Sequence, residues 1–254
     1  MGLCASIPTL GDVWVTPSAQ SLKAMANTFE RRYYVVTAIG IIAVVLAGFS
    51  IDVPLLGHLS SLSVLVRLHG LIMLTWIALF LIQTLLVARE RVDLHKRLGI
   101  FGALLALVVV VADTATLITA CRLGGKHLPP GASAPLFLAF GVFNLSTFTV
   151  LVGGALLLRE RRSDWHKRWM LLAAIILLDA ALSRFIGVYT SWTVDSSTVR
   201  NLIALTCMVV DTVRNRRLHP AFVIGGLLLF VNDYVAMWVA AKPAWLHVAS
   251  WLTG

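Results

Sequence analysis

Four histidines are the residues of this chain whose types and spacing best suit chemistry. An Asp-x-His-Lys-Arg motif occurs twice, at 93–97 and 164–168, and Arg-Glu-Arg precedes each copy by one or two residues. Imidazoles on separate helices of a membrane bundle are common axial ligands of b-type haem. We therefore take four histidines as candidate ligands, with haem b as the candidate cofactor and electron transfer or the assembly of a haem protein as the function: His69, His95, His166 and His219.

A simpler interpretation of the repeated motif requires no cofactor. Asp93 and Asp164 are suited to cap the helices that follow them. The Lys-Arg pairs can reach lipid headgroups, and a neutral imidazole tolerates that environment. On this interpretation the protein is a membrane scaffold without enzymatic activity, and its histidines carry no ligand.

Charged residues inside the apolar segments favour a different function. Asp113 follows His95 by 18 residues and Arg184 follows His166 by 18. Eighteen residues make five helical turns, so each pair shares one face, and we expect Asp113 and Arg184 to meet directly or through a polar bridge. A small-molecule or proton-coupled transporter could use the wider polar cluster, which also contains Arg67, Asn144 and Asp233. The same residues could instead fasten helices together, and spacing does not identify the partner of Asp179.

The sequence contains no motif that assigns an enzymatic reaction. Its three cysteines, Cys4, Cys121 and Cys207, have no CxxC spacing, which argues against a thiolate metal site or a disulfide framework. HExxH, the P-loop and GxGxxG are absent from usable contexts.

Composition indicates that lipid is the solvent of this chain. Hydrophobic residues make up 59% and charged residues only 13%, against about 25% charged in a soluble domain. The net charge of +9 comes from short clusters between apolar runs, as in cytoplasmic loops of membrane proteins. We therefore expect contact with a bilayer and not with nucleic acid, besides a membrane redox partner or a small-molecule ligand.

The chain is predicted to be all-α, with about seven transmembrane helices and an internal two-helix repeat. The sixth segment is doubtful because its continuous apolar part covers only 202–210, between Arg200 and Asp211. Without this segment, however, the Arg214–Arg217 cluster would lie outside, against the positive-inside rule. The expected segments are 33–50, 64–88, 98–120, 135–158, 169–190, 198–213 and 220–241.

The same rule predicts three regions in a bacterial cytoplasmic membrane. Residues 1–32 form a cytoplasmic tail, 33–241 a helix bundle and 242–254 an extracytoplasmic interfacial segment rich in tryptophan. The first six residues also fit the loose N-myristoylation pattern, with Gly2 as the acceptor and Cys4 as a second acylation site. A plain tail is the alternative.

Short motifs resemble those of uncharacterised bacterial multi-pass membrane proteins. They are Leu-His-Gly at 68–70, His-Lys-Arg-Leu-Gly at 95–99, His-Lys-Arg-Trp-Met at 166–170 and Leu-His-Pro-Ala at 218–221. That resemblance implies a topology but no activity. The helix-opening histidine motif is also distantly similar to a membrane family linked to haem–copper oxidase assembly, which would favour the haem hypothesis. Lysine stands here where those motifs have arginine.

Overall fold

The computed structural model describes residues 19–50, 63–124, 128, 132–189 and 195–253, all of whose regular structure is helical. The two acylation candidates, Gly2 and Cys4, lie outside these residues. Helices satisfy their backbone hydrogen bonds internally, which apolar surroundings require. The helices are α1 (Ala19–Ser50), α2 (Val64–Ala88), α3 (Val92–Leu123), α4 (Ala134–Leu158), α5 (Ser163–Ile176), α6 (Asp179–Tyr189), α7 (Ser196–Asn215), α8 (Pro220–Ala240) and α9 (Pro243–Thr253).

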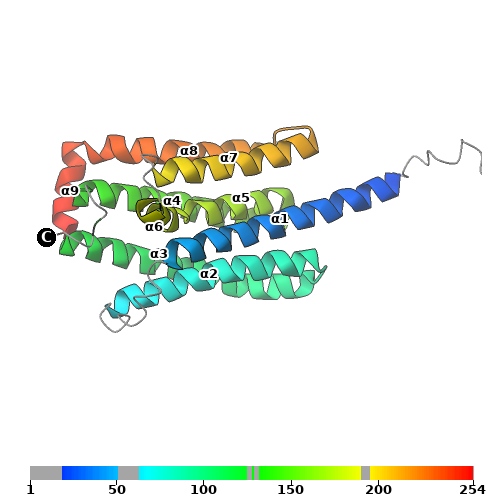
Figure 1. The fold of residues 1–254 in the computed structure, drawn as a ribbon, viewed down its shortest axis with the longest axis horizontal. Coiled ribbons are helices and arrows are strands. Elements are labelled where there is room, and N and C mark those ends of the chain that lie inside the picture. The colour runs from blue at the N-terminus through cyan, green and yellow to red at the C-terminus, as the bar shows by residue number, and fades with distance from the viewer. Residues whose placement is uncertain (1–18, 51–62, 125–127, 129–131, 190–194, 254) are drawn as a thin grey trace, which may run out of the picture.

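The described chain contains six helical stretches that are long and apolar enough to cross a membrane. They are α1 from Thr28 onward, α2, α3, α4, the stretch from α5 into α6 up to Gly187, and α8. The expected sixth segment corresponds to α7, which falls outside this set because it carries Arg200 and Asp211. Even so, its 20 residues span about 30 Å, and it runs alongside α8 (Figure 1).

The segment expected at 169–190 is not one continuous helix. α5 ends at Ile176, Leu177 and Leu178 form a turn, and α6 begins at Asp179. α6 turns away from the direction of α5 (Figure 1) and packs against α1, where Gly48 lies against the backbone of Ala181. The break has no glycine or proline, the residues from which helix interruptions are predicted.

Ion pairs gather the basic clusters at one end of the bundle. Glu90, between α2 and α3, accepts from Arg31 of α1 at 2.6 Å. Lys167 of α5 pairs with Glu30 of α1. His219, before α8, donates to Asp164 of α5 at 2.7 Å. Both copies of the repeated motif and the connection after α7 therefore share this end, which we call the basic end.

The opposite end is covered by α9, which runs across the bundle (Figure 1). Trp245 Nε1 donates to the carbonyl of Pro135 at 2.8 Å, and Arg122 donates to the carbonyl of Leu252 at 2.8 Å. Between the two ends, the apolar core centres on α4 and α5, where Phe148, Leu171 and Ile175 are completely buried. Within the expected segment at 242–254, α9 packs against α3 and α4.

Candidate functional site

A completely buried arginine marks the most polar point inside the bundle. Arg200, in the second turn of α7, has 0% of its surface exposed. Its Nη1 donates to Oδ2 of Asp179 and its Nη2 donates to Oδ2 of Asp233. Arg200 also donates to the side-chain oxygen of Asn201 at 3.1 Å. One guanidinium thereby joins the first residue of α6 to the middle of α8.

Side-chain amides extend these contacts to α4. Asn144 donates to Oδ2 of Asp179 at 3.1 Å, and its own oxygen accepts from Asn232 at 2.6 Å. Thr147 donates to the oxygen of Asn232 at 2.9 Å. We define the Arg200 centre as the five side chains of Asn144, Asp179, Arg200, Asn232 and Asp233. It connects α4, α6, α7 and α8.

The Arg200 centre contains one fixed positive charge and two carboxyl groups. With both carboxyls ionised, it would carry a net charge of −1 inside an apolar bundle, where an unbalanced charge is expensive. Asp179 Oδ1 is buried and makes no hydrogen bond within the described part of the chain. The centre therefore has both the charge and an unused acceptor to hold a proton or a small cationic group.

Two residues of the predicted polar cluster, Asn144 and Asp233, belong to this centre. The missing partner of Asp179 is Arg200, which hydropathy places only at the border of a doubtful span. A signal for it is nevertheless present in the sequence, because Arg200 and Asp211 are 11 residues apart and therefore share one helix face. When two opposite charges lie on the same face of an otherwise apolar helix, that face is expected to pack against charged or polar residues of other helices.

The expected pair of Asp113 and Arg184 does not form a direct ion pair in the described structure. Asp113 Oδ1 lies 3.9 Å from Nδ1 of His69. The guanidinium of Arg184 stacks on Phe49, 4.6 Å from the ring centroid. Arg67 is exposed in the first turn of α2 and does not belong to the Arg200 centre.

The four candidate ligand histidines do not converge on one point. Only His95 and His166 lie together, with ring centroids 6.2 Å apart. His69 instead neighbours Asp113. His219 caps α8 by accepting the backbone N–H of Ala221 at Nδ1, at 3.1 Å, so that Nε2 carries the proton donated to Asp164. With both nitrogens occupied, His219 is a structural residue in this conformation.

A second buried ion pair lies toward the basic end of α7. Arg168 of α5 donates from Nε and Nη2 to the carboxylate of Asp211 at 2.8–3.1 Å, and both side chains are about 5% exposed or less. A polar cavity of about 170 Å³ adjoins this pair and is also lined by Glu30, Lys167 and His219. α7 is therefore held by buried charges at two depths, three turns apart.

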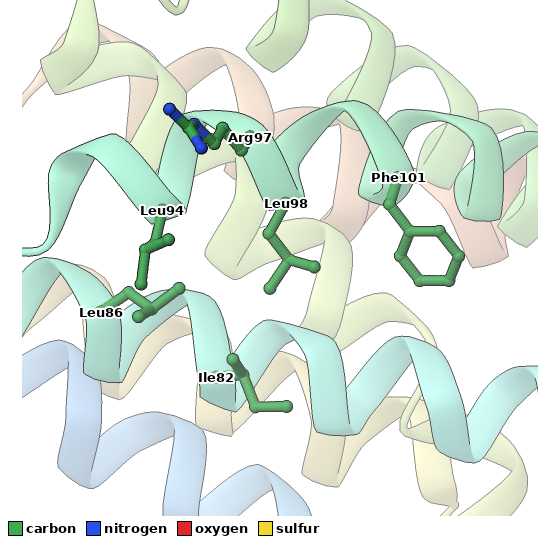
Figure 2. A pocket seen from close by; sticks show the side chains of 6 residues that line it. All are labelled: Ile82, Leu86, Leu94, Arg97, Leu98 and Phe101. Atoms are coloured by element: carbon green, nitrogen blue, oxygen red, sulfur yellow. The ribbon is translucent and has the colours of Figure 1, made fainter.

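An apolar groove runs between α2 and α3 near the basic end (Figure 2). It has a volume of about 490 Å³. Ile82, Leu98 and Phe101 are among its apolar walls, and Arg97 supplies its only charge. Such a lining suits a lipid acyl chain and offers no pair of groups for catalysis.

Comparison of the chain with protein-family models, curated proteins and solved structures finds no match.

Proposed function

We propose that this protein is a membrane transporter that moves a small solute or ion together with protons, with the Arg200 centre as its intramembrane binding site. The observation that carries the proposal is the completely buried Arg200 shared by two carboxyl groups, one of which keeps an unpartnered oxygen. A fastener between helices needs only one carboxylate for one guanidinium. The second carboxylate gives the site a place for an exchangeable positive charge.

The interrupted α5–α6 segment supports the same function. Transporter binding sites are commonly built at discontinuous membrane helices, because the ends of the half-helices leave polar groups free for ligands. Asp179 begins the second half-helix and contacts Arg200 directly. Asp233 and Asn144 come from continuous helices on the other side of the centre. A small shift of α6 relative to α8 would therefore change how the two carboxyl groups share Arg200.

The proposal is tested first by the protonation state of the centre. Infrared difference spectra of the purified full-length protein should show the carbonyl stretch of a protonated carboxyl near neutral pH. Asp179→Asn or Asp233→Asn should remove that signal, whereas Asp93→Asn should keep it. Asp93 is the matched control because it is an exposed aspartate at the start of α3.

A functional measurement complements the spectra. In proteoliposomes that contain a pH-sensitive dye, with Na⁺ or K⁺ supplied as the test solute, the wild-type protein should dissipate an imposed pH gradient faster than Asp179→Asn, and Asp93→Asn should match the wild type. Equal rates for all three proteins, together with no protonated carboxyl and no spectral response to Na⁺ or K⁺, would make the Arg200 centre a fastener and the protein a scaffold.

A further inference from the structure

The two copies of the Asp-x-His-Lys-Arg motif use their basic residues differently. In the second copy, Lys167 binds a carboxylate of α1 and Arg168 binds a carboxylate of α7. In the first copy, Lys96 and Arg97 are exposed, and neither forms an ion pair or a hydrogen bond with another residue of the described structure. The first copy therefore leaves two cations available for a ligand at the basic end.

Arg97 lines the apolar groove between α2 and α3 (Figure 2). Leu94, Arg97, Leu98 and Phe101 have the i, i+3, i+4, i+7 spacing of one helix face, and together they form the α3 wall of the groove. Side chains of a helix lean toward its N-terminus, and α3 begins at the basic end. The guanidinium of Arg97 therefore extends toward the basic end, while Leu98 and Phe101 line the groove farther into the bundle.

The dimensions of the groove suit an acyl chain of one leaflet. From Leu94 to Phe101 the α3 wall is about 10 Å long. The hydrocarbon of one leaflet is about 15 Å thick, which is half of the bilayer core. The groove volume of about 490 Å³ is within the usual range for ligand-binding pockets. Ile82 and Phe101 are 46% and 50% exposed, so the groove opens sideways, and a lipid can enter it from the bilayer.

The charges beside Arg97 favour an anionic headgroup. Residues 89–97 contain four Lys or Arg and only two acidic residues. Both acidic side chains already face arginines, since Glu90 pairs with Arg31 and Asp93 lies 3.6 Å from Arg91. A phosphate can accept two parallel hydrogen bonds from the guanidinium of Arg97. Basic pockets between membrane helices bind anionic headgroups, whereas the excess of positive charge repels a headgroup ammonium.

We propose that the groove between α2 and α3 binds one anionic phospholipid from the leaflet at the basic end. Arg97 binds its phosphate, and one acyl chain lies along Ile82 and Leu98. No residue of this site belongs to the Arg200 centre, so lipid binding is independent of the proposed transport.

Native mass spectrometry tests the headgroup contact. The full-length protein in detergent is given equal amounts of dioleoylphosphatidylglycerol and dioleoylphosphatidylcholine, and it should retain one phosphatidylglycerol in preference. Arg97→Gln should weaken that binding about tenfold or more, the effect of losing one charged hydrogen bond. Arg161→Gln is the matched control, because it removes the same charge from an exposed residue at the same end, between α4 and α5. Its binding should match the wild type.

A second pair of variants tests the acyl-chain contact. Ile82→Trp fills the groove and should weaken the binding of both lipids. Ile100→Trp adds the same bulk to a side chain that is 63% exposed and lies outside the groove, so it should leave binding unchanged. Both positions are exposed, and thermal unfolding in detergent confirms that each variant is folded. Inorganic phosphate should not displace the lipid, because it has no acyl chain.

Three results would overturn the proposal. Equal losses in Arg97→Gln and Arg161→Gln would show attraction to the basic end as a whole. Displacement of the lipid by inorganic phosphate, with unchanged binding in Ile82→Trp, would assign Arg97 to a free phosphate. A protein dimer that excludes the lipid and dissociates in Ile82→Trp would assign the groove to a second copy of the chain.

Discussion

A guanidinium with no exposed surface needs compensation from its neighbours, because water no longer solvates it. Arg200 receives it from two carboxyl groups and Asn201, and Arg168 receives it from the single carboxylate of Asp211. The difference between these two arginines distinguishes their roles. Arg168 and Asp211 balance each other, as a fastener requires, whereas the Arg200 centre has one carboxyl group more than its charge demands.

Replacing only one residue of the Arg168–Asp211 pair should destabilise the protein more than replacing both. Arg168→Met leaves Asp211 buried without a partner, and Asp211→Leu leaves Arg168 in the same state, so each should cost about 3–5 kcal/mol of unfolding free energy. The double variant should recover most of that loss. The measurement is a double-mutant cycle of detergent-induced unfolding in SDS.

The exposed pair of Arg31 and Glu90 provides the control for this cycle. Their side chains are 36% and 72% exposed, so the same kind of cycle should detect no coupling between them. Additive effects of the Arg168 and Asp211 substitutions would show that the buried pair contributes nothing beyond its separate residues.

Helix α5 packs through one bulky side chain that lies between two glycines of neighbouring helices. Trp169 lies against Gly154 of α4 and Gly225 of α8, and its Nε1 donates to the carbonyl of Ala221 at 2.8 Å. A Cβ on Gly154 would overlap the indole, and one on Gly225 would lie 2.6 Å from Leu172 Cδ1. The glycines allow α4 and α8 to approach α5 closely.

Alanine at either glycine should therefore overpack this contact. Gly154→Ala and Gly225→Ala should each lower the unfolding free energy by about 1–3 kcal/mol. Gly153→Ala is the matched control, since a Cβ there meets nothing within 4 Å, and helix propensity should make it neutral or slightly stabilising. Thermal unfolding in detergent measures all three. Equal effects at Gly153 and Gly154 would contradict the packing described.

The start of α7 provides a prediction that depends on pH. Asp195 caps this helix by accepting from the backbone of Thr198 at 2.6 Å. The hydrogen bond from the Ser197 hydroxyl, with further help from Thr198, holds the pKa of Asp195 below its usual value. A lowered pKa means that the cap stabilises the fold above the unfolded-state pKa of about 3.9 and is lost as pH falls through the folded-state value.

Asp195→Asn should keep the cap geometry but remove its titration. The difference in unfolding free energy between wild type and this variant should be roughly constant near neutral pH and should shrink as the medium is acidified below about pH 4. Asp195→Ala should cost about 1 kcal/mol at neutral pH. The difference in unfolding free energy between wild type and Asp195→Asn removes the contribution of the other carboxylates, which is the same in both proteins. If that difference did not change with pH, the negative charge of Asp195 would not contribute to the cap.

The elements show where sequence reasoning succeeds and where it stops. Hydropathy predicted α2, α4 and α8 to within one residue at each end, because length and apolarity alone define such helices. It could not predict the break at Leu177–Leu178, because no glycine or proline marks it in the sequence. Hydropathy made α7 a doubtful span because Arg200 and Asp211 lower its mean hydropathy, and a hydropathy scale takes no account of the ion-pair partners of these residues.

The candidate site was predictable to a similar extent. Asn144 and Asp233 were recognised as polar residues within apolar helices, but which residues meet depends on how helices rotate and pack. For the same reason, the equal spacing that favoured an Asp113–Arg184 pair did not anticipate that α6 leaves the line of α5. The repeated motif did indicate equivalent positions for His95 and His166, and these rings do meet.

For the whole molecule, the course of α7 determines the topology. Its Arg200 contacts the middle of α8, while its Asp211 contacts Arg168 near the start of α5. Between Arg200 and Asp211, α7 must therefore run from mid-bundle toward the basic end, and the connection after it lies beside Asp164. If α7 crosses the membrane as a seventh helix, the basic clusters all share one side, and α9 lies on the other, consistent with the positive-inside rule.

Single cysteines should report this arrangement directly. In a chain whose own cysteines are replaced by serine, cysteines at Glu90, Glu160 and Arg217 should react with a membrane-impermeant maleimide from the same side. A cysteine at Lys242 should react only from the opposite side. If the cysteine at Arg217 were instead labelled from the side opposite to those at Glu90 and Glu160, and the cysteine at Lys242 from their side, α7 would not cross, because α8 lies between Arg217 and Lys242. The Arg168–Asp211 and His219–Asp164 contacts could not then form in the membrane, because their partners would lie on opposite sides. The buried ion pairs therefore require that the cysteines at Glu90 and Arg217 be labelled from the same side.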